Sequence, residues 1–87
     1  MNIEKLHQLH ELSGEAWKWF RMKDQVEVKD RDDLFWNEVV NDIAKMVSKV
    51  KYPEFETVFK DLLNAYAGQL QKNYKEYIDT KQEKLPI

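Results

Sequence analysis

The sequence predicts an all-α fold: an antiparallel bundle of three helices, of which the third is long. Apolar residues recur with the period of an α-helix over most of the chain. Two Gly and two Pro among 87 residues are too few for a β fold that is rich in turns. No apolar run approaches the roughly 20 residues that a membrane span requires. We therefore expect a single helical domain over residues 1–87 that does not enter a membrane.

Residues 2–22 are predicted to form the first helix. Trp17 and Trp19 lie at the two edges of its apolar stripe, which holds Leu6, Leu9, Leu12, Ala16 and Phe20. The helical period is lost in the acidic connector that follows, residues 24–31. Val26 and Val28 alternate there with charged neighbours, so we expect a loop with a short extended piece.

Residues 32–51 carry the clearest helical pattern of the chain. Asp30 or Asp32 can cap the N-terminus of this helix, and lysines near its end suit the negative end of the helix dipole. The pattern predicts an amphipathic helix with one face in a core. Its apolar residues fall within one arc, namely Phe35, Trp36, Val39, Val40, Ile43, Met46, Val47 and Val50.

Residues 53–84 are predicted to form the third helix, with Pro53 as its first residue. A break near Gly68, which would make four helices, is the alternative. An unbroken helix would measure about 48 Å, against about 30 Å for each of the others. Its last third, with Tyr74, Tyr77 and Ile78, would then extend beyond the bundle, and we expect it to complete a homodimer. The predicted core comprises Leu9, Ala16, Phe20, Trp36, Val39, Ile43, Val47, Phe59, Leu62, Leu63, Tyr66 and Leu70.

No pattern in the sequence predicts an enzyme, a metal or another cofactor. His7 and His10 share a helical face with Glu11, but no third strong metal ligand is indicated elsewhere. Glu38 and Asp42 are predicted to face solvent, so they cannot line an internal magnesium site like that of all-α nucleotide pyrophosphatases. The chain has no Cys, as is common in proteins of the reducing cytoplasm, where we expect this one.

Large apolar and aromatic side chains at the edges of the predicted stripes are candidates for a protein interface, because such residues dominate binding energies. They are Trp17, Trp19, Leu34, Tyr74, Tyr77 and Ile78. The alternative is a nucleic-acid face built by the lysines of the third helix, interleaved with Tyr74 and Tyr77. Its lysines are Lys72, Lys75, Lys81 and Lys84. Acidic residues lie among them and the net charge is −2, so we do not expect nucleic acid as the main partner.

Two segments carry a resemblance in style to a group of known proteins. They are Leu34-Phe35-Trp36-Asn37-Glu38-Val39-Val40 and Tyr52-Pro53-Glu54-Phe55-Glu56. With them, the chain resembles the small helical proteins of unknown function that phages and prophages of low-GC Gram-positive bacteria carry. The resemblance implies an accessory protein that acts by binding, as an inhibitor or modulator of a host or defence protein. It assigns no functional residue.

Overall fold

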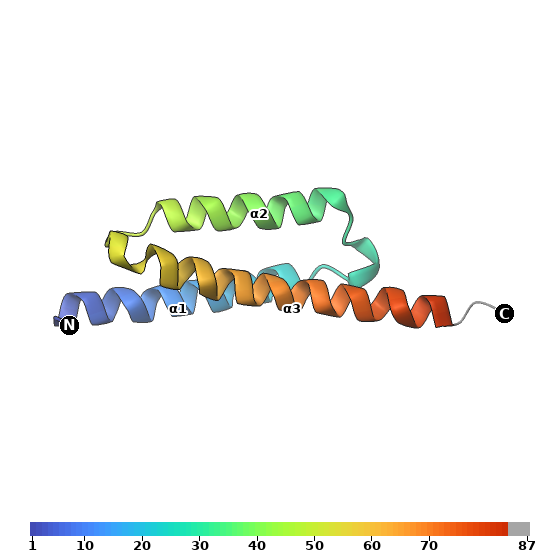
Figure 1. Ribbon diagram of the computed structural model, residues 1–87, viewed down its shortest axis with the longest axis horizontal. Coiled ribbons are helices and arrows are strands. Elements are labelled where there is room, and N and C mark those ends of the chain that lie inside the picture. The colour runs from blue at the N-terminus through green and yellow to red at the C-terminus, as the bar shows by residue number, and fades with distance from the viewer. Residues whose placement is uncertain (84–87) are drawn as a thin grey trace.

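The computed structural model describes residues 1–83, and every regular element in them is helical (Figure 1). The three α-helices are α1 (Ile3–Asp24), α2 (Asp33–Ser48) and α3 (Glu56–Glu83). Two 3₁₀ turns, η1 (Val28–Asp30) and η2 (Pro53–Phe55), lie in the connectors. The predicted all-α class is therefore confirmed, with the last helix the longest.

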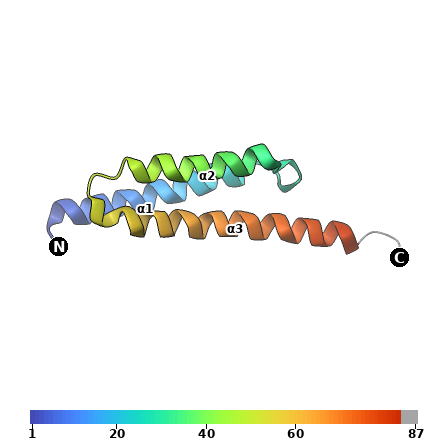
Figure 2. The same ribbon diagram turned by 45° about the horizontal axis from the view of Figure 1, so that its top comes forward.

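The helices lie lengthwise beside one another in a rod of 61 × 20 × 19 Å. Helices α1 and α3 run in the same direction, and α2 runs back in the opposite one (Figure 1). The C-terminal part of α3 continues past the connector between α1 and α2, as the view turned by 45° also shows (Figure 2). With 28 residues α3 measures about 42 Å, whereas the 16 residues of α2 measure about 24 Å.

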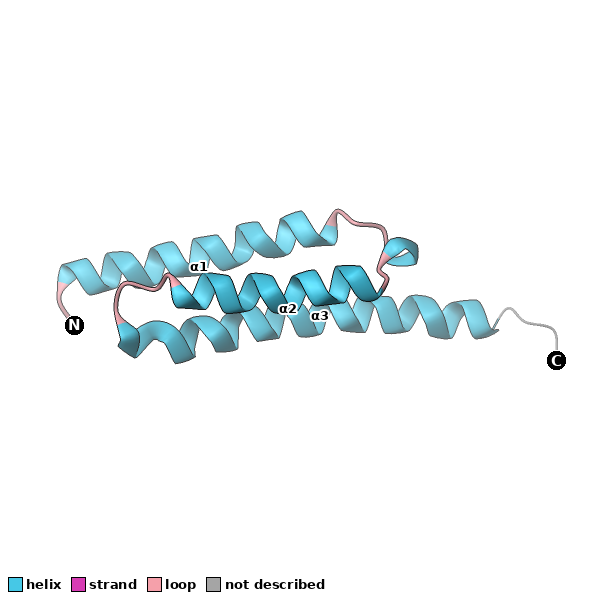
Figure 3. Cartoon of the chain, turned by 90° about the horizontal axis from the view of Figure 1, so that it is seen from above, coloured by secondary structure: helices cyan, strands magenta, loops and turns pink. Residues whose placement is uncertain are grey.

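Side-chain caps define where the first two helices begin. The Asn2 side chain accepts a hydrogen bond from the Lys5 N–H at 2.9 Å, and Asp32 caps α2 by accepting from the Phe35 N–H at 3.0 Å. Pro53 does not open α3 directly, because it starts η2, from which the chain passes into α3 at Glu56 (Figure 3).

Several predicted boundaries are wrong by a few residues. Helix α1 continues to Asp24, and α2 ends at Ser48 instead of residue 51. The expected extended piece at Val26 and Val28 is absent from the described connector, where residues 28–30 form a 3₁₀ turn. Helix α3 passes through Gly68 without a break. One Gly costs a helix only about 1 kcal/mol, and the burial of the neighbouring Ala67 and Leu70 in the core outweighs that cost.

The core runs along the middle of the rod. Its buried apolar members are Leu12, Ala16, Trp19, Phe35, Val39, Ile43, Phe55, Phe59, Leu63, Ala67 and Leu70. Six predicted core residues are among them. The other six only pack partly buried against this cluster, because three helices cover less of each apolar arc than the period alone suggests. These six are Leu9, Phe20, Trp36, Val47, Leu62 and Tyr66.

Candidate protein-binding surfaces

Three aromatic rings form a ladder along the line where α1 and α3 meet, which we call the aromatic seam. Phe20 stacks on Tyr66 with ring centroids 5.0 Å apart, and Trp17 lies 6.0 Å from Phe20 and 6.3 Å from Tyr66. Trp17 nevertheless remains 48% exposed. The seam therefore presents an exposed Trp17 ring whose position is fixed by its contacts with Phe20 and Tyr66.

The two helices of the seam carry further exposed apolar side chains. Leu6 lies on α1 at a helical spacing that places it on the side of Trp17, and Val58 lies on α3 two turns before Tyr66. Both are about half exposed, at 51% and 50%. Large apolar side chains that are exposed in this way are candidates for contact with a partner.

The aromatic residues that were predicted to extend beyond the bundle form a second aromatic group, near the C-terminal end of α3. Tyr74 contacts Trp36 of α2 edge-on at 5.7 Å, and Tyr77 lies 6.5 Å from Tyr74. The Lys81 ammonium group lies 5.9 Å from the centre of the Tyr77 ring. Tyr74, Tyr77 and Ile78 are all partly buried. Tyr74 thus belongs to the α2–α3 contact, and Tyr77 and Ile78 follow it along α3.

Trp19 is not an edge residue, and its assignment to an exposed interface is wrong. Its side chain is only 5% exposed, and its indole Nε1–H donates to the Asp42 carboxylate at 3.0 Å. Lys23 Nζ lies 2.8 Å from the same carboxylate oxygen. The prediction that Asp42 faces solvent is therefore wrong in part: its side chain remains 30% exposed, but Trp19 and Lys23 of α1 bind its carboxylate.

The pKa of the Asp42 carboxyl reflects these contacts. Partial burial by itself raises this pKa, because it disfavours the charged form. The hydrogen bonds from Lys23 and Trp19, with the charges of Lys23 and Lys45, more than offset burial. The pKa consequently lies below its ordinary value of 3.8.

The remaining candidates do not join either aromatic group. Leu34 is 66% exposed on the solvent side of α2. Lys72 and Lys81 are nine residues apart, which at about 100° per residue places them on opposite sides of α3. Lys75 is exposed, and Lys84 lies outside the described residues. The proposed lysine face is thus not a single face of the helix.

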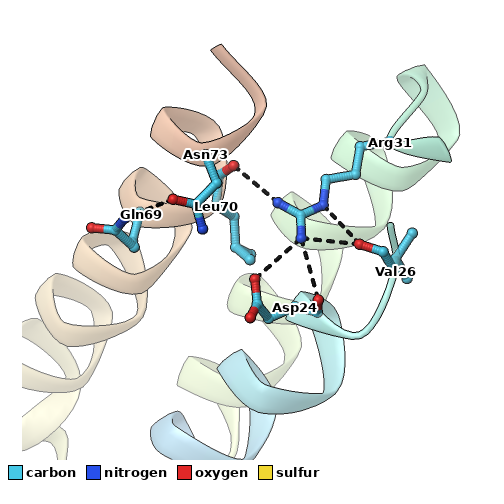
Figure 4. Close-up of polar contacts among 6 residues, drawn as sticks. All are labelled: Asp24, Val26, Arg31, Gln69, Leu70 and Asn73. Atoms are coloured by element: carbon cyan, nitrogen blue, oxygen red, sulfur yellow. Dashed lines mark hydrogen bonds and ion pairs between the residues drawn. The ribbon is translucent and has the colours of Figure 1, made fainter. Parts of the chain in front are cut away.

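A buried arginine in the connector was not anticipated from the sequence. Arg31 is 3% exposed, and its guanidinium group donates to the backbone carbonyls of Asp24, Val26 and Leu70 and to the Asp24 carboxylate (Figure 4). It also lies 5.5 Å from the centre of the Phe35 ring. One signal of this role was present in the sequence: the acidic connector contains a single Arg, and that Arg comes just before the capping residue of a helix. Arg31 binds the connector to α3 and is a structural residue.

Hollows on the surface of residues 1–83 include the following two. One, of about 320 Å³, runs between α2 and α3 and is mainly apolar; its lining residues are Val40, Ile43, Ala44, Val47, Lys60 and Asn64. We call it the Val40 groove. The other, of about 310 Å³, is polar and lies near the N-terminus of α1; its lining residues are Glu4, His7, Gln8, Glu11, Lys51 and Tyr52.

His7 is therefore placed at the polar hollow, near Glu4 and Glu11. Even so, no group of three or more side chains that could hold a metal ion is present in the described part of the chain. Within that part there is also no helix long and apolar enough to cross a membrane.

Comparison of the chain with protein-family models, with curated proteins and with solved structures finds no match.

Proposed function

We propose that this protein is a small protein-binding module that acts stoichiometrically, without a cofactor and without catalysis. Its target would be a host or defence protein, as the resemblance to phage accessory proteins implies. The aromatic seam is the observation that supports this function: Trp17 is half exposed although it packs against Phe20 and Tyr66.

The seam has the physical properties of an interface anchor. Trp and Tyr supply much of the binding energy at protein interfaces, because they bury large areas and have few rotatable bonds. The contacts of Trp17 within the seam also restrict its ring before any partner arrives, which reduces the entropy lost on binding.

We also propose how the helices are arranged and in which compartment the protein acts. The opposite directions of α2 and its two neighbours favour an antiparallel three-helix bundle. The absence of cysteine from the sequence favours the cytoplasm. The partner would cover the apolar side chains along the seam.

The test compares two substitutions of exposed apolar residues on α1. Trp17→Ala removes the centre of the seam, and Met22→Ala is the matched control, since Met22 is 56% exposed on another side of the same helix. Tagged wild type and both variants would be used to capture partners from a bacterial lysate, with and without nuclease. The affinity for the captured protein would then be measured by calorimetry.

We expect capture of one protein in stoichiometric amount, indifferent to nuclease. Trp17→Ala should bind it about 30-fold more weakly, corresponding to roughly 2 kcal/mol for a hot-spot residue, and Met22→Ala should bind like wild type. Equal loss in both variants, or none, would exclude the seam as the binding site. Loss of all partners with nuclease would favour the nucleic-acid alternative.

We propose a second copy of the chain as the partner for the C-terminal part of α3, which continues past the α1–α2 connector (Figure 1) and which carries Tyr77 and Ile78. Tyr77→Asp should leave the helical circular dichroism unchanged and weaken self-association, because a carboxylate would have to be desolvated in the contact. Sedimentation velocity over a concentration series measures this. A sedimentation coefficient that is the same for both proteins at every concentration would refute the homodimer.

A further inference from the structure

The apolar arc of α2 is wider than its two neighbours cover. Phe35, Val39 and Ile43 are buried in the core. Val40 follows Val39 and lies about 100° further round the helix, and it is 66% exposed. Val40, Ala44 and Val47 follow the spacing i, i+4, i+7, which places them on one side of α2, and all three line the Val40 groove. This side of α2 has the apolar pattern of a helix contact, but no helix among residues 1–83 covers it.

The lining of the groove has one charged side chain, and it is positive. Lys60 is the single charged residue among those that line it, and Asn64, one turn further along α3, adds an uncharged amide. Lys60 is exposed, and it takes part in none of the ion pairs found among the described side chains. No carboxylate lines the groove.

We propose that the Val40 groove binds an amphipathic helix of a partner protein, one whose apolar stripe is flanked by a carboxylate that pairs with Lys60. Grooves between two helices commonly bind such a helix through apolar residues spaced by three, four and seven. The small side chain of Ala44 lets the backbone of the incoming helix approach closely. Lys60, at the edge of the groove, would select an acidic helix over a basic one.

This inference rests on the proposed protein-binding function and names one kind of partner for it. It concerns a different surface from the aromatic seam, which lies between α1 and α3. The two surfaces can therefore be tested separately, and either can fail alone.

The experiment uses two synthetic 18-residue helical peptides as probes. Both carry the same stripe of Leu and Ala; the residues that flank the stripe are Glu in the acidic peptide and Lys in the basic one. Binding to the full chain would be followed by fluorescence anisotropy at low salt, up to about 1 mM protein, which detects even weak complexes. The proteins are wild type, Lys60→Glu, Val40→Asp and Val58→Asp, the last being the matched control on the α1–α3 side.

We expect wild type to bind the acidic peptide about two- to fivefold more tightly than the basic peptide, as one exposed ion pair allows. Lys60→Glu should reverse this preference. Val40→Asp should weaken binding of both peptides at least about tenfold, because it places a charge in the apolar contact, and Val58→Asp should change neither. Val40 is exposed, so its variant should still fold, which thermal melting by circular dichroism checks.

Three results would overturn the proposal. The first is that neither peptide binds wild type over this range. The second is binding that Val40→Asp leaves unchanged, which would place the peptides elsewhere. The third is a wild-type dimer that Val40→Asp dissociates in sedimentation, since the groove would then be occupied by a second copy of the chain. A Trp17→Ala variant that binds both peptides like wild type would confirm that the groove acts independently of the seam.

Discussion

The region in which the three helices pack has two ends, and the connectors there are held in different ways. At the α1–α2 connector, the buried Arg31 links the end of α1, the connector and α3 through hydrogen bonds to Asp24, Val26 and Leu70. At the α2–α3 connector, the contacts with α1 are exposed. They include the Lys5–Glu54 ion pair, a hydrogen bond from the Lys51 N–H to the Gln8 side chain at 3.2 Å, and one from the Tyr52 hydroxyl to Glu4 at 3.4 Å.

The difference shows where polar contacts matter for the stability of this fold. A surface ion pair is screened by water and contributes roughly 0–1 kcal/mol. A buried charge must keep every partner, because an unpaired charge or carbonyl in the interior costs much more. We therefore expect substitutions at the Arg31 end to affect folding and those at the Lys5 end to have little effect.

The largest effect is predicted for Arg31→Met, which keeps an apolar chain of similar length but removes every hydrogen bond of the guanidinium group. We expect the free energy of unfolding to fall by about 3 kcal/mol, the low end for breaking a buried charged contact, because the Asp24 side chain retains access to water. Urea unfolding at pH 7 measures it. A midpoint within error of wild type would mean that the hydrogen bonds of Arg31 add nothing to stability.

A smaller effect, which depends on pH, is predicted for Asp42→Asn between the two ends. Because the pKa of Asp42 is lowered in the folded state, its charged form stabilises the fold at pH values above its unfolded pKa, near 3.8. This stabilisation is lost as the pH falls through the lower, folded pKa. We expect the variant to be about 1 kcal/mol less stable at pH 7, the typical net contribution of one hydrogen bond, and the difference to shrink below pH 4. Urea unfolding at pH 7, 5 and 3 measures the difference; one that grew on acidification would contradict the assignment.

The control for both substitutions is Lys5→Met, which removes the exposed ion pair with Glu54. The free energy of unfolding should change by less than about 1 kcal/mol, and less still at high salt. A loss of stability as large as that of Arg31→Met would mean that the two connectors do not differ in how much their polar contacts stabilise the fold.

The helices were predictable because their signals are local. Asp32 caps α2 as expected, and the apolar arc from Phe35 to Val47 faces the core along most of its width. The length of α3 and the partial exposure of Trp17 also followed from periodicity. The Val40 groove did not, because the same pattern placed Val40 inside the apolar arc and only the neighbouring helices show that it is left uncovered.

The sequence by itself determined the all-α class, the order of the helices and the approximate width of each apolar face, since capping and a period of 3.6 act over neighbouring residues. Only the tertiary structure decided which edge of each face is covered. The buried Trp19 donates its N–H to Asp42 on another helix, and the buried Arg31 donates to the Leu70 carbonyl of α3. Both contacts join residues that are far apart in the chain. A local pattern in the sequence gives no information about the distance between such residues in space.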